Sequence, residues 1–305
     1  MIKVVFLLAY DYEYVKFSLP CVYEYADQIL FSIDKNRISW SGNHFKFDES
    51  IIDWIKTYDV NNKIRFYEDD FYVSSNTPMQ NDTRQRQLSA NFLGKGGWTL
   101  MIDVDEYFLN FKAFVTLLNK YNNYLIDPKK TPICIAANWI NVFKQDESGF
   151  YFISESNFPV KIATNNPEYT MARDLNHFTY YSDFVIVHQS WARPKEEMKF
   201  KLENWSHKND IINASNYYEF WLGVNENNYR KVKDFCNAHP ASAWKRLDFI
   251  KAKDPIELIK ESRNFKPNRV FLFRKNLVQL LRKNKFFREI RDYFVELIRK
   301  RSYNG

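Results

Sequence analysis

Short apolar runs and helically spaced stretches alternate over positions 1–110. Continuous apolar runs are typical of parallel strands, which are covered on both faces, and they predict strands at Val4–Ala9, Gln28–Ile33, Lys63–Tyr67 and Trp98–Ile102. Helical spacing predicts helices at Tyr12–Tyr25, Ile51–Tyr58 and Asp82–Leu93. This alternation predicts right-handed crossovers, and therefore an α/β fold with a mostly parallel central sheet flanked by helices.

The pattern changes beyond Pro132. Long β-rich segments are expected at Ile133–Phe143, Phe150–Ser154 and Phe184–His188. A helix is expected after Pro194, and the chain is expected to be helical again from Ala241. With no internal repeat or low-complexity linker, we expect one domain over residues 1–250, with halves at about 1–110 and 111–250, and a tail over 251–305.

The tail carries the chain's positive charge. Between Arg269 and Arg301 there are eleven Lys/Arg and three Asp/Glu, a net charge of +8, so the remaining residues sum to −1 of the total +7. Apolar residues recur there at helical spacing, which predicts a basic amphipathic helix, or two with a break near Asn284. Such a helix either lies on an anionic membrane surface or packs on the protein body or a second copy.

Composition excludes several classes. The seven glycines include no GxGxxG turn and no GxxxxGK[ST] loop, which argues against a nicotinamide dehydrogenase or a P-loop NTPase. The three cysteines are far apart, so neither a disulfide framework nor a zinc ribbon is indicated and a reducing cytosol is expected. The longest charge-free stretch, Thr131–Phe143, is too short to span a membrane, and the first apolar run is too short for a signal peptide.

The most informative stretch is Trp98–Phe108, a hydrophobic strand that runs into Asp103 and Asp105. If the strand stays extended, both carboxylates project to the same side, because side chains alternate with a period of two. They lie at the carboxyl end of the strand, where open α/β sheets bind ligands. Paired carboxylates there suit Mg²⁺ or Mn²⁺ with a diphosphate as partner.

The context of this pair carries a family resemblance. A capped helix with Arg86 precedes it, followed by the turn Gly94–Gly97, the strand and the Asp-x-Asp of Asp103–Asp105. This order resembles the A-type (GT-A) nucleotide-sugar glycosyltransferases, particularly the family-two-like group, over roughly residues 1–210. The resemblance implies a nucleotide-binding half at about 1–110 and an acceptor half at about 111–250. The family's usual Asp-Asp-x-Ser after the second strand is missing.

The resemblance also implies site roles. Asp103 would contact the donor ribose or the metal, and Asp105 would coordinate the divalent cation on the diphosphate. Arg86 and Arg84 would face the nucleotide or its phosphates, and Asp34, at the end of the second strand, would contact the base or ribose. For each of these residues an ordinary structural role, as a cap, a turn residue or a solvated surface charge, stays open.

A second cluster, Val185–Arg193 followed by Lys201, resembles the late His-x-Ser-Trp and lysine segment of several A-type transferases. There His188 would complete the metal site and Lys201 would meet a phosphate. Inversion at the anomeric carbon needs a base for the acceptor hydroxyl, and Asp174 is the candidate we favour over Asp146, Glu147 and Asp183.

The sequence therefore predicts a metal-dependent glycosyltransferase of hexosyltransferase type, most simply inverting, with a UDP-sugar as donor and a glycan or lipid-linked acceptor in cell-surface polysaccharide synthesis. It would use Mn²⁺ or Mg²⁺ and lie at the inner face of the cell membrane through its tail, and a homo-oligomer stays open. The alternatives are a sugar-nucleotide nucleotidyltransferase and a non-enzymatic basic protein that binds nucleic acid or membranes. The neutral body argues against nucleic acid.

Overall fold

The computed structural model describes residues 1–283 apart from 155–157, 211–212 and 237–242, and residues 284–305 lie outside the description. Across the described residues, eleven strands form one mixed sheet, whose main path runs β10-β11-β7-β6-β8-β4-β1-β2-β3. The α/β class with a central sheet flanked by helices is confirmed. The strands pair in parallel from β4 to β3, and the sheet continues beyond β4 with antiparallel pairs.

The parallel half forms where the apolar runs predict it. Its strands are β1 (Ile2–Leu8), β2 (Gln28–Asp34), β3 (Ile64–Asp69) and β4 (Trp98–Asp103). Its helices are α1 (Val15–Val22), α2 (Ser50–Tyr58), α3 (Pro78–Leu93) and α4 (Phe111–Lys120), and one-turn 3-10 helices flank α1 at Tyr12–Tyr14 and Tyr23–Tyr25. Because alternate residues of β1 face opposite ways, Val4 and Phe6 join one apolar core with α1, α2 and α4, whereas Val5 and Leu7 join another with α3.

The start and end of α3 are fixed by local chemistry. Thr77 and Gln80 form a capping box at its start, and Pro78 occupies the first turn. At its end, the buried Nζ of Lys3 in β1 donates to the carbonyls of Leu93 (3.2 Å), Gly94 (2.8 Å) and Lys95 (3.0 Å). A cation at a helix C-terminus is favourable, so β1 and α3 are held together before the chain enters β4.

The other half is largely antiparallel. It contains β5 (Glu106–Phe108), β6 (Ile133–Asp146), β7 (Gly149–Ile153), β8 (Pro159–Thr164), β9 (Phe178–His188), β10 (Lys233–Cys236), β11 (Ala243–Ile250), α5 (Lys195–Asn204) and α6 (Ala214–Gly223). The β-rich segments after Pro132 and the helix after Pro194 are confirmed. The expected helix from Ala241 is wrong: β11 pairs with β7 and β10, and Trp244 packs on Phe235, so tertiary pairing overrides the helical propensity of the segment.

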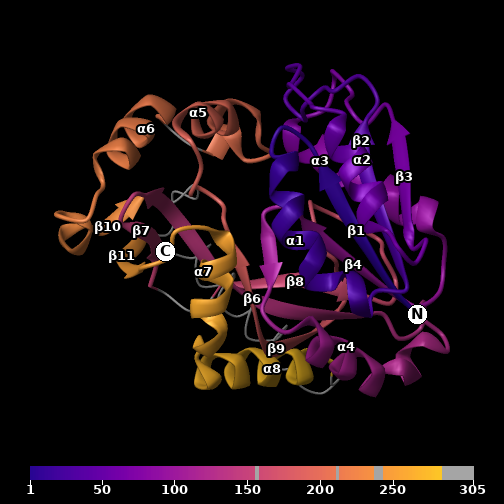
Figure 1. The fold of residues 1–305 in the computed structure, drawn as a ribbon. Coiled ribbons are helices and arrows are strands. Elements are labelled where there is room, and N and C mark those ends of the chain that lie inside the picture. Colours follow the sequence, from indigo (N-terminus) through magenta and orange to yellow (C-terminus); the bar gives the residue numbers. More distant parts are fainter. Residues whose placement is uncertain (155–157, 211–212, 237–242, 284–305) are drawn as a thin grey trace, which may run out of the picture.

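Two helices follow β11, α7 (Pro255–Glu261) and α8 (Arg269–Lys283). Figure 1 shows α8 along the edge of the molecule below β9, away from α5 and α6. The expected break near Asn284 and the helix beyond it lie outside the described residues. Within residues 1–283 as described, no helix is long and apolar enough to cross a membrane.

Candidate active site

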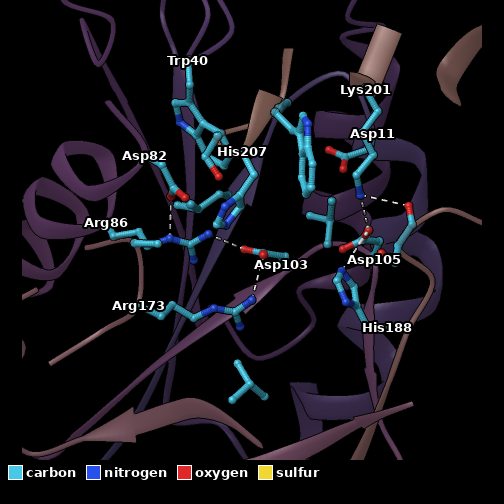
Figure 2. A pocket seen from close by; sticks show the side chains of 18 of the residues that line it. Asp11, Trp40, Asp82, Arg86, Asp103, Asp105, Arg173, His188, Lys201 and His207 are labelled. Atoms are coloured by element: carbon cyan, nitrogen blue, oxygen red, sulfur yellow. Dashed lines mark hydrogen bonds and ion pairs between the residues drawn. The ribbon is translucent and has the colours of Figure 1, made fainter. Parts of the chain in front are cut away.

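A cavity of about 810 Å³ opens where the two halves of the sheet meet. Its walls include the carboxyl ends of β1, β2 and β4, the segment 171–174, the end of β9 and the helix α5. Strand β4 ends at Asp103 and a turn follows at Val104–Asp105, so the extended geometry expected for the two aspartates does not persist. Both nevertheless line the cavity, where they belong to separate clusters (Figure 2).

The first cluster, which we call the Asp103 cluster, consists of Asp82, Arg86, Asp103, Arg173 and Glu106. Arg86 donates from Nε to Asp82 (2.6 Å) and from Nη2 to Asp103 Oδ1 (3.0 Å). Arg173 donates to Asp103 Oδ2 (2.9 Å) and to both oxygens of Glu106 (2.8 and 2.6 Å). Asp103 is thus held between two guanidinium groups.

Two groups of the Asp103 cluster matter for ligand binding: the carboxylate of Asp103 and the buried Nη1 of Arg86, which is unpaired among the described residues. Burial raises the pKa of Asp103, but Arg173 and Arg86 outweigh it, and the net effect is a lowered pKa. The side chain of Asp103 remains 27% exposed, facing the cavity. Among the described atoms, Nη1 of the buried Arg86 has no hydrogen-bond partner. A buried guanidinium nitrogen left unpaired at a cavity wall is suited to an anionic or carbonyl oxygen of a ligand.

The second cluster, which we call the Asp105 cluster, consists of Asp11, Asp105, His188, Arg193 and Lys201. Arg193 donates to Asp105 Oδ2 and to Asp11 Oδ2. His188 Nε2 and Lys201 Nζ each lie 3.7 Å from Asp105 Oδ2. Although burial raises the pKa of Asp105, His188, Lys201 and Arg193 hold it well below its usual range. Asp105 is therefore an ionised carboxylate.

His188 is placed by strand pairing. Its strand β9 lies between β5 and β6 at this end, so that His188 is opposite Glu106 in β5 and Asn141 in β6. His188 Nδ1 lies 2.9 Å from Asn141 Oδ1. Burial lowers the pKa of His188 to about 4, so the imidazole is neutral at pH 7. An Nδ1–H donated to Asn141 leaves the Nε2 lone pair directed at Asp105, the arrangement that second-shell partners give to metal-bound histidines.

Asp105 and His188 are the residues of the Asp105 cluster that could hold a divalent cation. Across the described part of the chain, no group of three or more His, Cys, Asp or Glu residues could hold a metal. Asp105 and His188 would supply two ligands, although Asp105 Oδ2 already accepts from Arg193 and lies 3.7 Å from Lys201 Nζ. Mg²⁺ in proteins commonly combines one or two carboxylates with substrate phosphates and water. Among the described residues that line the cavity, six Asp outnumber four Lys/Arg, a net charge of −2.

Lys201 lies where the second sequence cluster predicts a phosphate contact. Its buried Nζ donates to the Ser190 carbonyl (2.9 Å) and faces the cavity beside Asp105. Burial and the neighbouring Arg193 lower the pKa of Lys201 to about 8, so most of the amine is protonated at pH 7. Figure 2 shows Lys201 and His188 on opposite sides of Asp105.

Two of the predicted donor-binding residues, Asp34 and Arg84, are engaged in contacts with the protein itself. Asp34 lines the cavity, but its two oxygens accept backbone N–H groups of Asn36, Ile38, Phe71 and Tyr72, so it holds two loops together and its ribose contact stays a prediction. Arg84 is absent from the described cavity lining and donates to the Asp70 carbonyl (3.2 Å). Residues two apart on a helix face nearly opposite ways, so Arg84 and Arg86 cannot both point inward.

Asp174, the predicted base, lies at the rim of the cavity. Its side chain is exposed, and Oδ1 lies 3.1 Å from Lys161 Nζ. Its role stays a prediction. Arg173, beside it in sequence, is the residue that enters the site, because the turn Met171–Asp174 presents the two side chains in different directions.

Sequence reasoning missed five residues of the two clusters: Asp11, Asp82, Glu106, Arg173 and Arg193. Asp82 had a local signal, since it precedes Arg86 by one helical turn. Asp11 follows the first strand directly, where a ligand contact is common. Arg173 and Arg193 come from loops far beyond Asp103 in the sequence, and no local pattern indicates their contacts.

Comparisons with known proteins assign no family. No protein-family model matches the chain, and no curated protein matches it. Among solved structures, mannose-6-phosphate isomerase from Helicobacter pylori has a TM-score of 0.31 at 14% identity over 52% of this chain and 60% of that chain. Mannose-1-phosphate geranyltransferase from Thermus thermophilus has a TM-score of 0.27 at 9% identity over 52% and 49%.

UDP-glucose pyrophosphorylase complexed with UDP-glucose has a TM-score of 0.24 at 9% identity, over 55% of this chain and 77% of that chain. The chain spans less than two thirds of the length of the isomerase and the geranyltransferase. The names of these three structures refer to mannose phosphates or to UDP-glucose. Scores this low assign no activity to the chain.

Proposed function

We propose that the chain is an enzyme acting on a nucleotide sugar, and specifically a metal-dependent glycosyltransferase that moves a sugar from a nucleoside-diphosphate donor to a glycan or lipid-linked acceptor. The observation that carries the proposal is the Asp105 cluster. An ionised carboxylate and a neutral imidazole, distant from each other in sequence, meet 3.7 Å apart in a cavity whose described lining has a net charge of −2.

Asp105 and His188 would hold the Mn²⁺ or Mg²⁺, which as a Lewis acid stabilises charge on the departing diphosphate. Lys201 offsets further charge on the same leaving group, from a position already fixed by Ser190. Arg86 would contact the nucleotide or its phosphates from the cavity wall, and Asp103 keeps that guanidinium in place. Asp174 at the rim accepts the proton of the acceptor hydroxyl in an inverting transfer.

Nucleoside-diphosphate binding tests the cation site. We expect Mn²⁺ to tighten binding of UDP, or of one other nucleoside diphosphate in a panel, by about tenfold or more in the wild type. Asp105→Asn and His188→Gln should each remove most of that dependence. Asp183→Asn is the matched control, because Asp183 is an exposed carboxylate on the same strand as His188. If Mn²⁺ changes no affinity, or changes all variants equally, the proposed cation site is wrong.

A sugar-nucleotide nucleotidyltransferase is the second candidate, since a cation and a diphosphate would serve it in the same cavity. UDP-glucose pyrophosphorylase, one of the structural neighbours, is such an enzyme. Against this candidate, Leu7–Asp11 after β1 contains no glycine-rich phosphate loop. Two product assays separate them: nucleoside-diphosphate release from a nucleotide sugar supports the transferase, and pyrophosphate release from a nucleoside triphosphate with a sugar 1-phosphate supports the alternative.

A further inference from the structure

Helix α8 has one face that is fixed to the protein body. Asn276 accepts from the backbone N–H of Tyr181 (2.8 Å) and donates to its carbonyl (2.9 Å), and Gln279 accepts from the N–H of Thr179 (3.2 Å). Leu272 is buried on the same side. Two side-chain amides thus hold α8 against the edge of β9, and the orientation of its other face is set.

The other face carries an apolar stripe that stands in solvent. Val270, Phe273, Leu277 and Leu280 are 62%, 67%, 43% and 57% exposed. At about 100° per residue they fall within one arc of roughly 80°, whose nearer edge, at Leu280, is about 40° from Asn276 and about 100° from Gln279. Arg269 and Arg274 lie at the two borders of this arc by the same geometry. The fifteen residues of α8 contain five Lys/Arg and no Asp or Glu.

We propose that this stripe docks on an anionic lipid bilayer. A helix that lies in the plane of a membrane buries an apolar face at the acyl boundary and places flanking cations at the headgroups. The stripe of α8 supplies that apolar face, and Arg269 and Arg274 supply the flanking cations. The proposal does not depend on the enzymatic function.

Charge favours lipid over the other occupants. A second copy docked face to face by a two-fold axis would bring Arg269 and Arg274 of both copies together without an acid from either helix. Residues 284–305 contain six Lys/Arg against three Asp/Glu, so their net charge has the same sign as that of α8. Nucleic acid matches the charge but leaves four large apolar side chains in water. An anionic bilayer would bury the apolar stripe and pair its flanking cations with anionic headgroups.

The position of α8 links membrane docking to the orientation of the candidate active site. Figure 1 shows α8 at the edge of the molecule, where an extended surface can reach it. The strand β9, to which α8 is bound at Thr179 and Tyr181, ends at His188 in the cavity. Docking through α8 would therefore hold the cavity at a fixed orientation to the bilayer.

Vesicle co-sedimentation of the full chain tests the proposal. We expect binding to phosphatidylcholine vesicles with about 30% phosphatidylglycerol and little binding to phosphatidylcholine alone. Phe273→Ser with Leu277→Ser should lower the partition coefficient about tenfold or more. The matched control is Val60→Ser with Ile126→Ser, which changes two apolar residues elsewhere that are even more exposed and should bind like the wild type.

A charge variant is independent of the apolar one. Arg269→Gln with Arg274→Gln should reduce binding about 25-fold, at about fivefold for each cation. Circular dichroism should show both variants folded, since all four side chains are exposed. The proposal is overturned if the chain binds both vesicle types equally, or if both variants bind like the wild type. It is also overturned if the chain binds no vesicles and instead forms a concentration-dependent dimer or a nucleic-acid complex that the serine variant loses.

Discussion

Arg173 neutralises the most deeply buried acid of the candidate site, and removing it should cost stability that depends on pH. Glu106 is 1% exposed, and Arg173 donates to both of its oxygens. Arg173 also donates to Asp103 and to the Met101 carbonyl, and lies over the Trp139 ring. In Arg173→Gln, Glu106 keeps only neutral donors, Trp139 Nε1 and the backbone N–H of Asp103.

Breaking a buried ion pair by removing one partner costs about 3–5 kcal/mol, because the other charge stays buried without compensation. For a chain of this size that corresponds to a fall of about 5–8 °C in Tm. Burial already raises the pKa of Glu106, against the opposing effect of Arg173. Without Arg173 the pKa rises further above its unfolded value, so the folded variant binds more protons than the unfolded chain.

The stability of the variant should therefore fall as the pH rises from 5 to 8, and its deficit against the wild type should be at least about 1 kcal/mol larger at pH 8. Urea unfolding followed by circular dichroism measures both values. Arg173→Gln with Glu106→Gln should recover most of the stability and lose the pH dependence. The exposed Arg246→Gln is the control, with a change below about 1 kcal/mol. A deficit that is absent, or equal at both pH values, would refute the reasoning.

Three further predictions concern the scaffold. Gly97→Ala should lower the free energy of unfolding by about 1–3 kcal/mol more than Gly96→Ala, as measured by urea unfolding. Both glycines have positive φ, but only at Gly97 would an added Cβ meet the Met1 carbonyl oxygen, at 2.5 Å. Thr77→Ala should cost about 1 kcal/mol through the α3 capping box, and Thr57→Ala, on an exposed helical face, should cost less. Burial raises the pKa of Cys21 and of Cys134 to about 12, so iodoacetamide should leave both unmodified at pH 8 in the folded protein and label both in urea, as peptide mass spectrometry reads directly.

The strands and helices of the parallel half were predictable because each buries apolar residues at its own period. The runs that predict β1, β2 and β4 are covered on both faces by α1, α2 and α3, so periodicity and burial agree. The error at Ala241 has the opposite cause. Strand β11 exists because β7 and β10 lie beside it, and that pairing is not encoded in the local propensity of its residues.

Asp103 and Asp105 were predictable because they follow a hydrophobic run, whereas Arg86, His188 and Lys201 were predicted through the family resemblance. The register of β9 between β5 and β6 then brings His188 to Asp105. Arg173 and Arg193 leave no such trace. Each is on an irregular segment, and its contact with an aspartate depends on where that segment crosses the folded sheet.

The two aspartates of one short motif therefore act on different partners. The turn after β4 separates them: Asp103 faces Arg86 and Arg173, whereas Asp105 faces His188, Arg193 and Lys201. Both oxygens of Asp103 accept from guanidinium groups, and its charge keeps Arg86 in place. Asp105 Oδ2 also accepts from a guanidinium, that of Arg193, but Asp105 is the aspartate with a neutral imidazole beside it, because His188 Nε2 lies 3.7 Å from the same oxygen. If Asp105 holds the cation, Asp103→Asn should weaken nucleoside-diphosphate binding equally with and without Mn²⁺, whereas Asp105→Asn should weaken it only when Mn²⁺ is present.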